Sequence, residues 1–233
     1  MKPFDVYKEL ENIEAKELKL RENRNSNNIS GYDDIYNFYK SEFFNAVDKF
    51  TLPGTNTTCC NDLYDFLLGG VDGLIYNFKD IEKLSKSLEP FHASDGFLLT
   101  GLYISALVNS VARSGQKLEL DFSNLNCKSF VEYMVFLGYG LDRNIEMTIN
   151  GYIGGWVGDH MKNGSIIVRG NVTGNCVGYE MQGGSIELFG NSGEHLGCKM
   201  NGGRIILHQS NYHLSNEKQK GEIYLNDERI FSK

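Results

Sequence analysis

This chain of 233 residues has no cysteine pattern that indicates a disulfide framework, and it has no secretory signal. The five cysteines are an odd number, and no two of them form a Cys-x-x-Cys motif. Cys59 and Cys60 are adjacent, a spacing that suits neither thiol exchange nor a zinc knuckle. We therefore expect a reduced, cytoplasmic protein with free thiols.

The chain also lacks an excess of basic residues and a long hydrophobic run. Its 23 lysines and arginines are outnumbered by 30 acidic residues, and the resulting net charge of −7 disfavours non-specific binding to nucleic acid or to an anionic membrane. The most apolar stretch, residues 97–111, is shorter than the roughly 18 residues that a membrane span requires. Because it also contains Thr100, Ser105 and Asn109, it predicts a buried helix.

Glycine, in contrast, is abundant, with 26 residues that crowd into the last third of the chain. Residues 163–170, 183–190 and 202–209 align with one another at spacings of 20 and then 19 residues. Glycines and methionines recur at equivalent positions around these blocks. They are Gly154, Gly174 and Gly193; Gly158, Gly178 and Gly197; Met161, Met181 and Met200; and Gly164, Gly184 and Gly203. A fixed period of this length indicates one supersecondary unit stacked on copies of itself, which is a solenoid.

Each repeat unit contains one strand. Apolar residues recur at every second position, for example at Ile186 and Leu188, and this period is typical of a strand with one buried face. Helical repeats are therefore excluded, and the recurrent glycines are expected at corners, where positive φ costs a glycine little. Strands that run in the same direction should pair in parallel and stack like residues on like. The expected interior ladders are Val157–Val177–Leu196, Met161–Met181–Met200, Ile166–Ile186–Ile205 and Val168–Leu188–Leu207.

The repeat decays at both ends, as expected for terminal coils. Upstream, residues 137–141 align with 157–161, and residues 147–151 align with 166–170. Downstream, residues 221–225 (GEIYL) repeat the Gly-x-Ile-x-Leu strand. The repeat thus predicts about five strand rungs, of which the central three are strong.

The pattern Gly-x-x-(x)-Gly-x-x-Val/Leu-Gly-x-x-Met-x-Gly-Gly-x-Ile-x-Leu, over residues 137–208, resembles the GXGXG domain. That domain is found at the C-terminus of the large subunit of glutamate synthase and in one of the subunits of formylmethanofuran dehydrogenase. The resemblance implies a right-handed parallel β-helix that serves mainly as a scaffold between catalytic parts. It assigns no catalytic role to any residue of this chain, and the region before about residue 115 does not share it.

The N-terminal half has helical periodicity. Residues 33–50 have a wide aromatic face at i, i+3, i+4 spacing and predict the clearest helix, whereas residues 5–22 predict a charged helix with a narrow apolar stripe. The polar run 23–30 predicts a loop. The expected helices cover residues 5–22, 33–50, 62–68, 80–88 and, from a cap at Ser94 and Asp95, a segment that ends near Arg113.

The pattern changes at Gln116. Alternation over residues 118–122 predicts the first strand, and helical spacing over about 129–137 predicts a helix that replaces one corner of the coil. The expected fold is α+β, with a helical region (1–115) followed by a short right-handed single-stranded parallel β-helix with GXGXG repeats (116–233). An open solenoid end leaves strand edges unpaired, so the helices should cap the upstream end.

The ladders do not repeat any chemical group, since His160 aligns with Glu180 and Lys199. Asp159, His160 and Glu180 could meet on adjacent coils, where paired carboxylates can act as acid and base. The aligned Lys199 interrupts such a row, which favours a solvated charged face. The histidines in general are expected at the surface or in local hydrogen bonds, so catalytic residues stay unassigned.

The sequence predicts no metal site and no cofactor. The glycines cannot form a nucleotide loop, because no helix and no Lys-Ser/Thr follow them. Cys176 and Cys198 are expected to pack as small apolar residues.

These features favour a non-catalytic scaffold or protein-interaction module. One alternative is an accessory subunit of an amidotransferase or redox complex, glutamate synthase-like or formylmethanofuran dehydrogenase-like. Another is a free-standing enzyme with a pocket between helices and solenoid, where His92 and Asp95 would be the polar pair to consider. We expect self-association or a protein partner near Ile223, Tyr224 and Leu225, and neither nucleic acid nor membrane as a partner.

Overall fold

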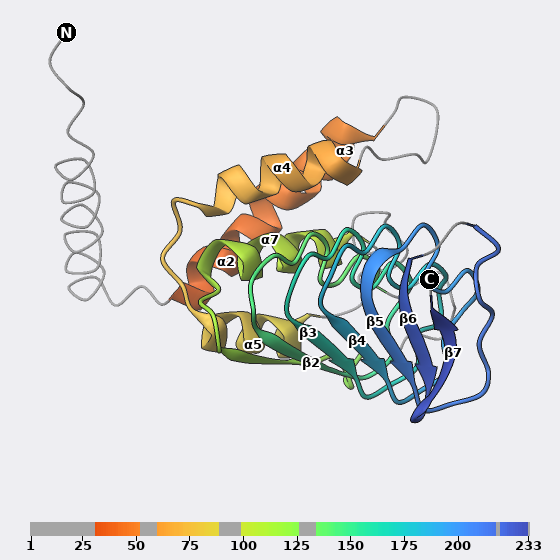
Figure 1. Cartoon of the computed structure of the whole chain (residues 1–233). Helices are drawn as coiled ribbons and strands as arrows, with labels where there is room; N and C mark the ends of the chain where they lie inside the picture. Colours follow the sequence, from red (N-terminus) through yellow and green to blue (C-terminus); the bar gives the residue numbers. More distant parts are fainter. Residues whose placement is uncertain (1–30, 52–59, 89–98, 126–133, 218–219, 233) are drawn as a thin grey trace, which may run out of the picture.

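The computed structural model describes residues 31–51, 60–88, 99–125, 134–217 and 220–232, and it has the predicted α+β architecture (Figure 1). The helices are α2 (Gly31–Phe38), the π-helix η1 (Tyr39–Phe43), α3 (Phe44–Phe50), α4 (Cys60–Val71), α5 (Phe78–Ser87) and α7 (Thr100–Val111). The strands are β1 (Lys117–Asp121), β2 (Glu146–Asn150), β3 (Ser165–Val168), β4 (Ser185–Leu188), β5 (Asn201–Leu207), β6 (Lys220–Leu225) and β7 (Glu228–Ser232).

The strands form one sheet in chain order, as a β-solenoid requires. Strands β1 to β6 are parallel, one per coil, and their register places Ile186 opposite both Ile166 and Ile205. The four predicted ladders are therefore confirmed, and each of their members is at most 2% exposed. Burial on this scale supplies the main stabilisation of the solenoid, because each coil covers the apolar face of the next.

Each coil turns at a corner where residues with a left-handed backbone (positive φ) alternate with residues in other backbone conformations. Gly178 has φ of 68°, and its amide donates to the Val157 carbonyl of the preceding coil at 2.8 Å. The equivalent residues Gly158 and Gly197 have φ of 67° and 66°. A second row with φ between 82° and 84° lies at the entry to the strands and consists of Gly164, Gly184 and Gly203. These two rows fulfil the predicted role of glycine at positive φ.

The remaining glycine row has a different role from the one predicted. None of Gly154, Gly174 and Gly193 has a positive φ. Instead, a Cβ on Gly174 would lie 2.3 Å from the amide nitrogen of Gly155, and a Cβ on Gly193 would lie 2.1 Å from the carbonyl oxygen of Gly174. Adjacent coils approach too closely here for any side chain, so close backbone approach explains these two glycines.

The helix predicted at residues 33–50 is confirmed. Segments α2, η1 and α3 follow one another without a break, because the residues at both ends of η1 keep the right-handed helical conformation. The aromatic face of this helix packs on α7, where the rings of Tyr39 and Phe43 each lie 5.6 Å from the ring of Tyr103.

Among the described helices, none combines the length and hydrophobicity needed to cross a bilayer.

The other predicted helices are present with different ends. Helix α4 extends beyond 62–68 at both ends, and α5 starts at Phe78 because Asn77 and Asp80 form a capping box. Helix α7 ends at Val111. The predictions for residues 5–22 and 23–30, and for His92, Ser94 and Asp95, fall outside the described residues.

The helix predicted at 129–137 is wrong over its described part. Met134 to Phe136 have no regular secondary structure, and Leu137 begins a turn. Phe136 has φ of 65°, which no right-handed helix contains, and its amide donates to the Gly155 carbonyl of the next coil at 3.2 Å. The apolar spacing arises because Met134 and Leu137 are buried inside this corner, at 3% and 0% exposure. Residues 129–133 lie outside the description.

Helices cap the upstream end of the solenoid, as predicted. At the free edge of β1, the amides of Glu119 and Asp121 donate to the Glu82 carboxylate and the Ser85 hydroxyl of α5, at 3.2 and 3.1 Å. Helix α7 covers the first corner, where the Ser105 hydroxyl accepts hydrogen bonds from backbone amides. The strand edge is thus satisfied by side chains of another element.

Strand β7 closes the downstream end by pairing antiparallel with β6. The register shifts between Ile223 and Tyr224, and Ile223 is completely buried opposite Phe231. A bulge, together with charged residues such as Glu228 and Arg229, hinders the pairing of an edge strand with another chain. The solenoid therefore has a cap of its own at this end.

Candidate functional site at the solenoid corner

Two rows of left-handed residues run along the corner edge of the solenoid. The first consists of Phe136, Trp156, Cys176 and His195, and the second of Gly140, His160, Glu180 and Lys199, with φ between 48° and 65°. A left-handed backbone costs a residue other than glycine roughly 1–2 kcal/mol. Strained residues of this kind concentrate at functional sites, so this edge is the candidate site.

Asp159, His160 and Glu180 meet at this edge. His160 Nδ1 lies 2.5 Å from Asp159 Oδ1, and His160 Nε2 lies 3.1 Å from Glu180 Oε2 on the next coil. The Glu180 and His160 side chains are 39% and 31% exposed, whereas that of Asp159 is only 5% exposed. The expectation of a solvated charged face is therefore wrong for Asp159, whose side chain is buried.

Burial changes the chemistry of Asp159. Loss of solvation is the main cause that raises the pKa of this carboxyl from 3.8 to about 6, since the charged form is disfavoured away from water. The hydrogen bond and charge of His160 oppose the shift, and the nearby Glu180 carboxylate adds to it. Asp159 can thus carry a proton at a pH where an exposed aspartate cannot.

Aromatic rings surround these ionisable groups. Trp156 lies between Phe136 and Tyr179, with ring centroids 5.5 and 5.0 Å away. The His160 ring is 5.5 Å from the ring of Tyr139, on the preceding coil, and 6.2 Å from that of Tyr179, on the next. The His160 ring thus lies near aromatic rings of both neighbouring coils.

Lys199 completes the row on the following coil. Its ammonium donates to the Tyr179 hydroxyl at 2.7 Å, lies 5.0 Å from the centre of that ring, and is 3.9 Å from Glu180 Oε1. The aligned residues His160, Glu180 and Lys199 therefore form a chain of alternating contacts. The sequence alignment predicted their stacking but not these contacts.

The cysteines near the corner are not activated. Burial is the main cause that raises the pKa of the Cys176 thiol to about 11, so it is protonated at neutral pH. Cys198 is 6% exposed, and both are free thiols, consistent with the predicted packing as small apolar residues. Cys60 begins α4, while Cys59 and Cys127 lie outside the described residues.

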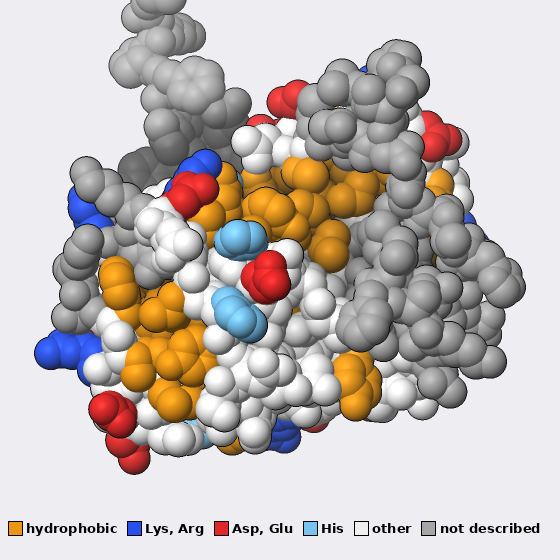
Figure 2. Space-filling model, turned by 90° about the vertical axis from the view of Figure 1, so that its right-hand side faces the viewer, with side chains coloured by type: hydrophobic (Ala, Val, Ile, Leu, Met, Phe, Trp, Pro, Cys, Tyr) orange, Lys and Arg blue, Asp and Glu red, His pale blue; other side chains and the backbone are white. Residues whose placement is uncertain are grey.

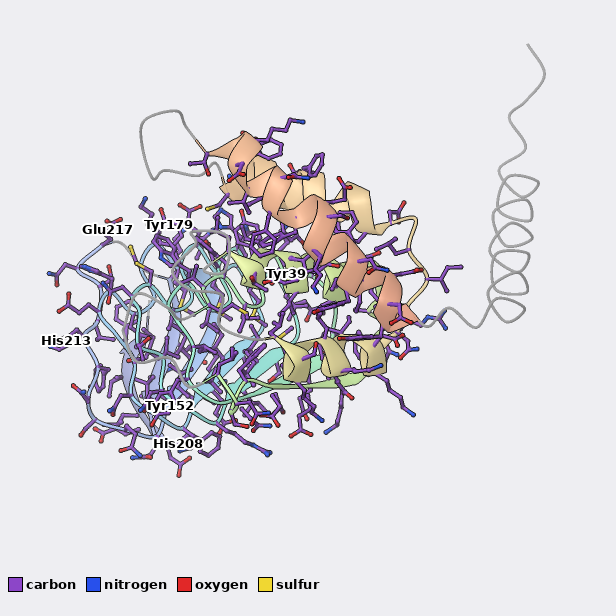
Figure 3. All side chains as sticks on the ribbon, turned by 180° about the vertical axis from the view of Figure 1, so that it is seen from behind. Tyr39, Tyr152, Tyr179, His208, His213 and Glu217 are labelled. Atoms are coloured by element: carbon purple, nitrogen blue, oxygen red, sulfur yellow. The ribbon has the colours of Figure 1, made fainter. Side chains whose placement is uncertain are left out.

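A second histidine–carboxylate pair lies on the opposite edge of the solenoid (Figure 3). His208 Nε2 is 2.7 Å from Glu187 Oε1, and the His208 ring stacks on Phe189 with centroids 4.3 Å apart. His195 and His213 are exposed. The prediction of surface or locally hydrogen-bonded histidines is thus confirmed for the four described ones, while His92 lies outside the description.

The predicted interaction residues are only partly accessible. Ile223 is buried, whereas Tyr224 and Leu225 are half-buried. Figure 2, which views the side where β6 and β7 lie, shows hydrophobic side chains in two patches separated by a polar strip that contains histidines. A partner at this end would contact Tyr224 rather than Ile223.

The methionines that recur in the sequence repeat have a structural role. Met161, Met181 and Met200 are inside the solenoid at 0–1% exposure.

A shallow groove of about 480 Å³ beside the sheet is lined by Gly184, Ser185, Gly203, Arg204, Gly221 and Glu222. Arg204 Nη2 lies 3.1 Å from Glu222 Oε2, so the charges in this groove neutralise each other.

Within the described ranges, no group of three or more His, Cys, Asp or Glu side chains could hold a metal ion. Comparison of the chain with protein-family models, with curated proteins and with solved structures finds no match. The resemblance to the GXGXG domain therefore rests on the repeat pattern alone.

Proposed function

We propose that this protein is a non-catalytic scaffold that binds a second copy or another protein through the outer face of its solenoid sheet. The observation that carries the proposal is a ladder of half-buried apolar side chains on that face. Ile167, Ile206 and Tyr224 lie in one register row with Thr148 and Glu187. The helices gather at the β1 end, and strands β4 to β6 extend away from them (Figure 1).

The surroundings of this row suit a protein interface. Phe189 and Tyr152, beyond the ends of β4 and β2, are 44% and 52% exposed. Large exposed apolar and aromatic side chains mark protein-binding surfaces on otherwise soluble folds. The capped ends and the buried Ile223 direct a partner to this face and to Tyr224, rather than to the strand edge at β7.

The proposal also includes a cellular location and a domain class. We place the protein in the cytoplasm, which the free thiols of Cys176 and Cys198 support. We also retain the GXGXG-type β-helix as the domain class, because the repeat predicted the ladders correctly. On that basis the module would join parts of a larger assembly, with catalysis on another chain.

The test compares matched variants of the full chain. Ile206→Arg places a charge in the centre of the proposed face, whereas Gln182→Arg adds the same charge at an exposed polar position. Light scattering should show wild-type mass above that of a monomer, or affinity capture should recover a stoichiometric partner. Ile206→Arg should abolish this association, and Gln182→Arg should retain it.

Three results would contradict the proposal. One is a wild-type chain that stays monomeric and recovers no stoichiometric partner. Another is an association that survives Ile206→Arg while this variant keeps the wild-type melting temperature. Turnover of a small molecule by the purified chain would instead favour the free-standing enzyme.

A further inference from the structure

The outer face of the sheet carries a regular pattern of charge. In strands β1 to β6, alternate side chains point outward, and the parallel register places equivalent residues side by side. The row nearest the strand starts consists of Lys117, Glu146, Ser165, Ser185, Arg204 and Glu222. Its signs along the solenoid are plus, minus, neutral, neutral, plus and minus. The same row in reverse order has the opposite sign at every charged position.

The charged pairs at the two ends of this row are open to solvent. Lys117 Nζ lies 2.8 Å from Glu146 Oε1, and Arg204 Nη2 lies 3.1 Å from Glu222 Oε2. All four side chains are at least 34% exposed, so a charge from outside can reach either pair. Strands β2 and β5 are three strand spacings apart, about 14 Å. Glu146 and Arg204 therefore cannot pair within one chain.

We propose that the occupant of this face is a second copy of the chain, packed face to face about a two-fold axis that is parallel to the strands and passes between β3 and β4. This inference rests on the interface proposed above and specifies its partner. The axis places β1 over β6 of the second copy and β2 over β5. Lys117 then faces Glu222 of the second copy, and Glu146 faces Arg204. Symmetry makes each contact occur twice.

The row beyond the strand ends also gains contacts in this arrangement. Arg169 is exposed, and among the described residues its guanidinium has no ion pair and no ring contact. Phe189 follows β4 as Arg169 follows β3, and it is 44% exposed. The axis places the Arg169 guanidinium opposite the Phe189 ring of the second copy, where a cation is attracted to the aromatic face.

The apolar row crosses the middle of the interface. Thr148 faces Ile206 of the second copy, and Ile167 faces Glu187. Glu187 is the poorest match, but its carboxylate stays paired with His208, whose Nε2 lies 2.7 Å away. Apolar burial in this row provides affinity, while the charged row determines the orientation of the two copies.

Other positions of the axis bring like charges together. An axis through β4 places Glu187 opposite its own copy and Glu146 opposite Glu222. An axis through β3 places Lys117 opposite Arg204. An axis along the solenoid again places Glu187 opposite itself. Because like charges across an interface are unfavourable, the charge pattern selects the axis between β3 and β4.

Two charge reversals in the full chain test this arrangement. Arg204→Glu and Glu146→Arg each turn two attractive contacts of the dimer into repulsive ones. In sedimentation equilibrium at low salt, the wild type should dimerise, and each variant alone should have a dissociation constant about tenfold higher or more. An equimolar mixture of the two variants should dimerise like the wild type, because each introduced charge then faces its opposite on the other chain.

The controls separate this effect from changes in net charge or folding. Lys79→Glu and Glu42→Arg make the same changes of charge at exposed positions of α5 and η1, outside the sheet, and each should dimerise like the wild type. If a variant of the first pair does not fold, Lys117→Glu mixed with Glu222→Lys provides the same test at the other contact.

The outcomes distinguish this inference from the proposed function. Dimers that resist both charge reversals but are abolished by Ile206→Arg would overturn the two-fold arrangement and leave the interface in place. A mixture that fails to restore dimers would overturn it as well. A monomeric wild type that captures a different protein, and loses it with Ile206→Arg, would overturn the second copy as occupant and retain the scaffold.

Discussion

At the scale of single residues, the solenoid depends on positions where only one kind of side chain fits. The corner glycines adopt φ near 67°, and the row at Gly174 and Gly193 has no space for a Cβ. The same corners nevertheless contain Trp156, His160 and Glu180 in left-handed conformations. These side chains are held there by their contacts with neighbouring coils, which offset the backbone strain.

Gly178 allows this strain to be measured. Its φ is 68°, and a Cβ would lie 2.8 Å from Cδ1 of Ile205. We expect Gly178→Ala to reduce the free energy of unfolding by roughly 1–2 kcal/mol, because an L-residue is disfavoured at this φ. Gly178→Val should cost more, since its branched Cβ is stiffer and larger. Circular dichroism melts with the same midpoint for the two variants would refute this reasoning.

At the scale of elements, the helices satisfy backbone groups that a lone solenoid would expose. Helix α5 provides acceptors for the edge of β1, and α7 does so for the first corner. These contacts link residues between 33 and 37 positions apart in the chain, so they form only when both parts are folded. We therefore regard the helical part as the upstream cap of the solenoid.

Ser105 tests this link between helix and solenoid. It is 1% exposed, and its hydroxyl accepts from the buried amide of Gly138 at 2.9 Å. Ser105→Ala removes this acceptor, and we expect a loss of about 1–3 kcal/mol in denaturant unfolding. Ser41→Ala is the control, because that exposed hydroxyl only donates to Asn37 within its own helical segment. Its effect should be below about 0.5 kcal/mol, and an equal loss in both variants would exclude a special role for Ser105.

At the scale of the whole molecule, one continuous core runs from the helices through the coils to Ile223. Such a core stabilises the fold, because stacked coils and helices bury each other's apolar faces. Among the described residues, no group of three or more His, Cys, Asp or Glu side chains could hold a metal ion. The ionisable groups of the corner are paired with one another instead.

Metal removal should have no effect on this molecule. We expect elemental analysis of the purified chain to give no stoichiometric zinc or iron, and a chelator to leave the melting midpoint unchanged. A structural metal would lower stability on removal, since its binding energy contributes to folding. About one metal per chain, with a lower midpoint after chelation, would contradict the prediction.

The sequence by itself determined the solenoid. The alternation at Ile186 and Leu188, repeated at 20 and 19 residues, defines a strand, its buried face and its neighbours. This information is local and periodic, so no knowledge of distant contacts was required. The same reasoning failed at residues 134–137, because apolar spacing in a short segment suits both a helix and a corner of left-handed and extended residues.

Only the tertiary structure decided the chemistry of the corner. The alignment placed His160 beside Glu180, but it did not reveal that the Asp159 side chain is only 5% exposed. The closeness of the glycine rows and the capping by Glu82, Ser85 and Ser105 likewise depend on separations between distant segments. Desolvation and hydrogen bonding act over a few ångströms, and such distances are defined only when the coils and helices pack together.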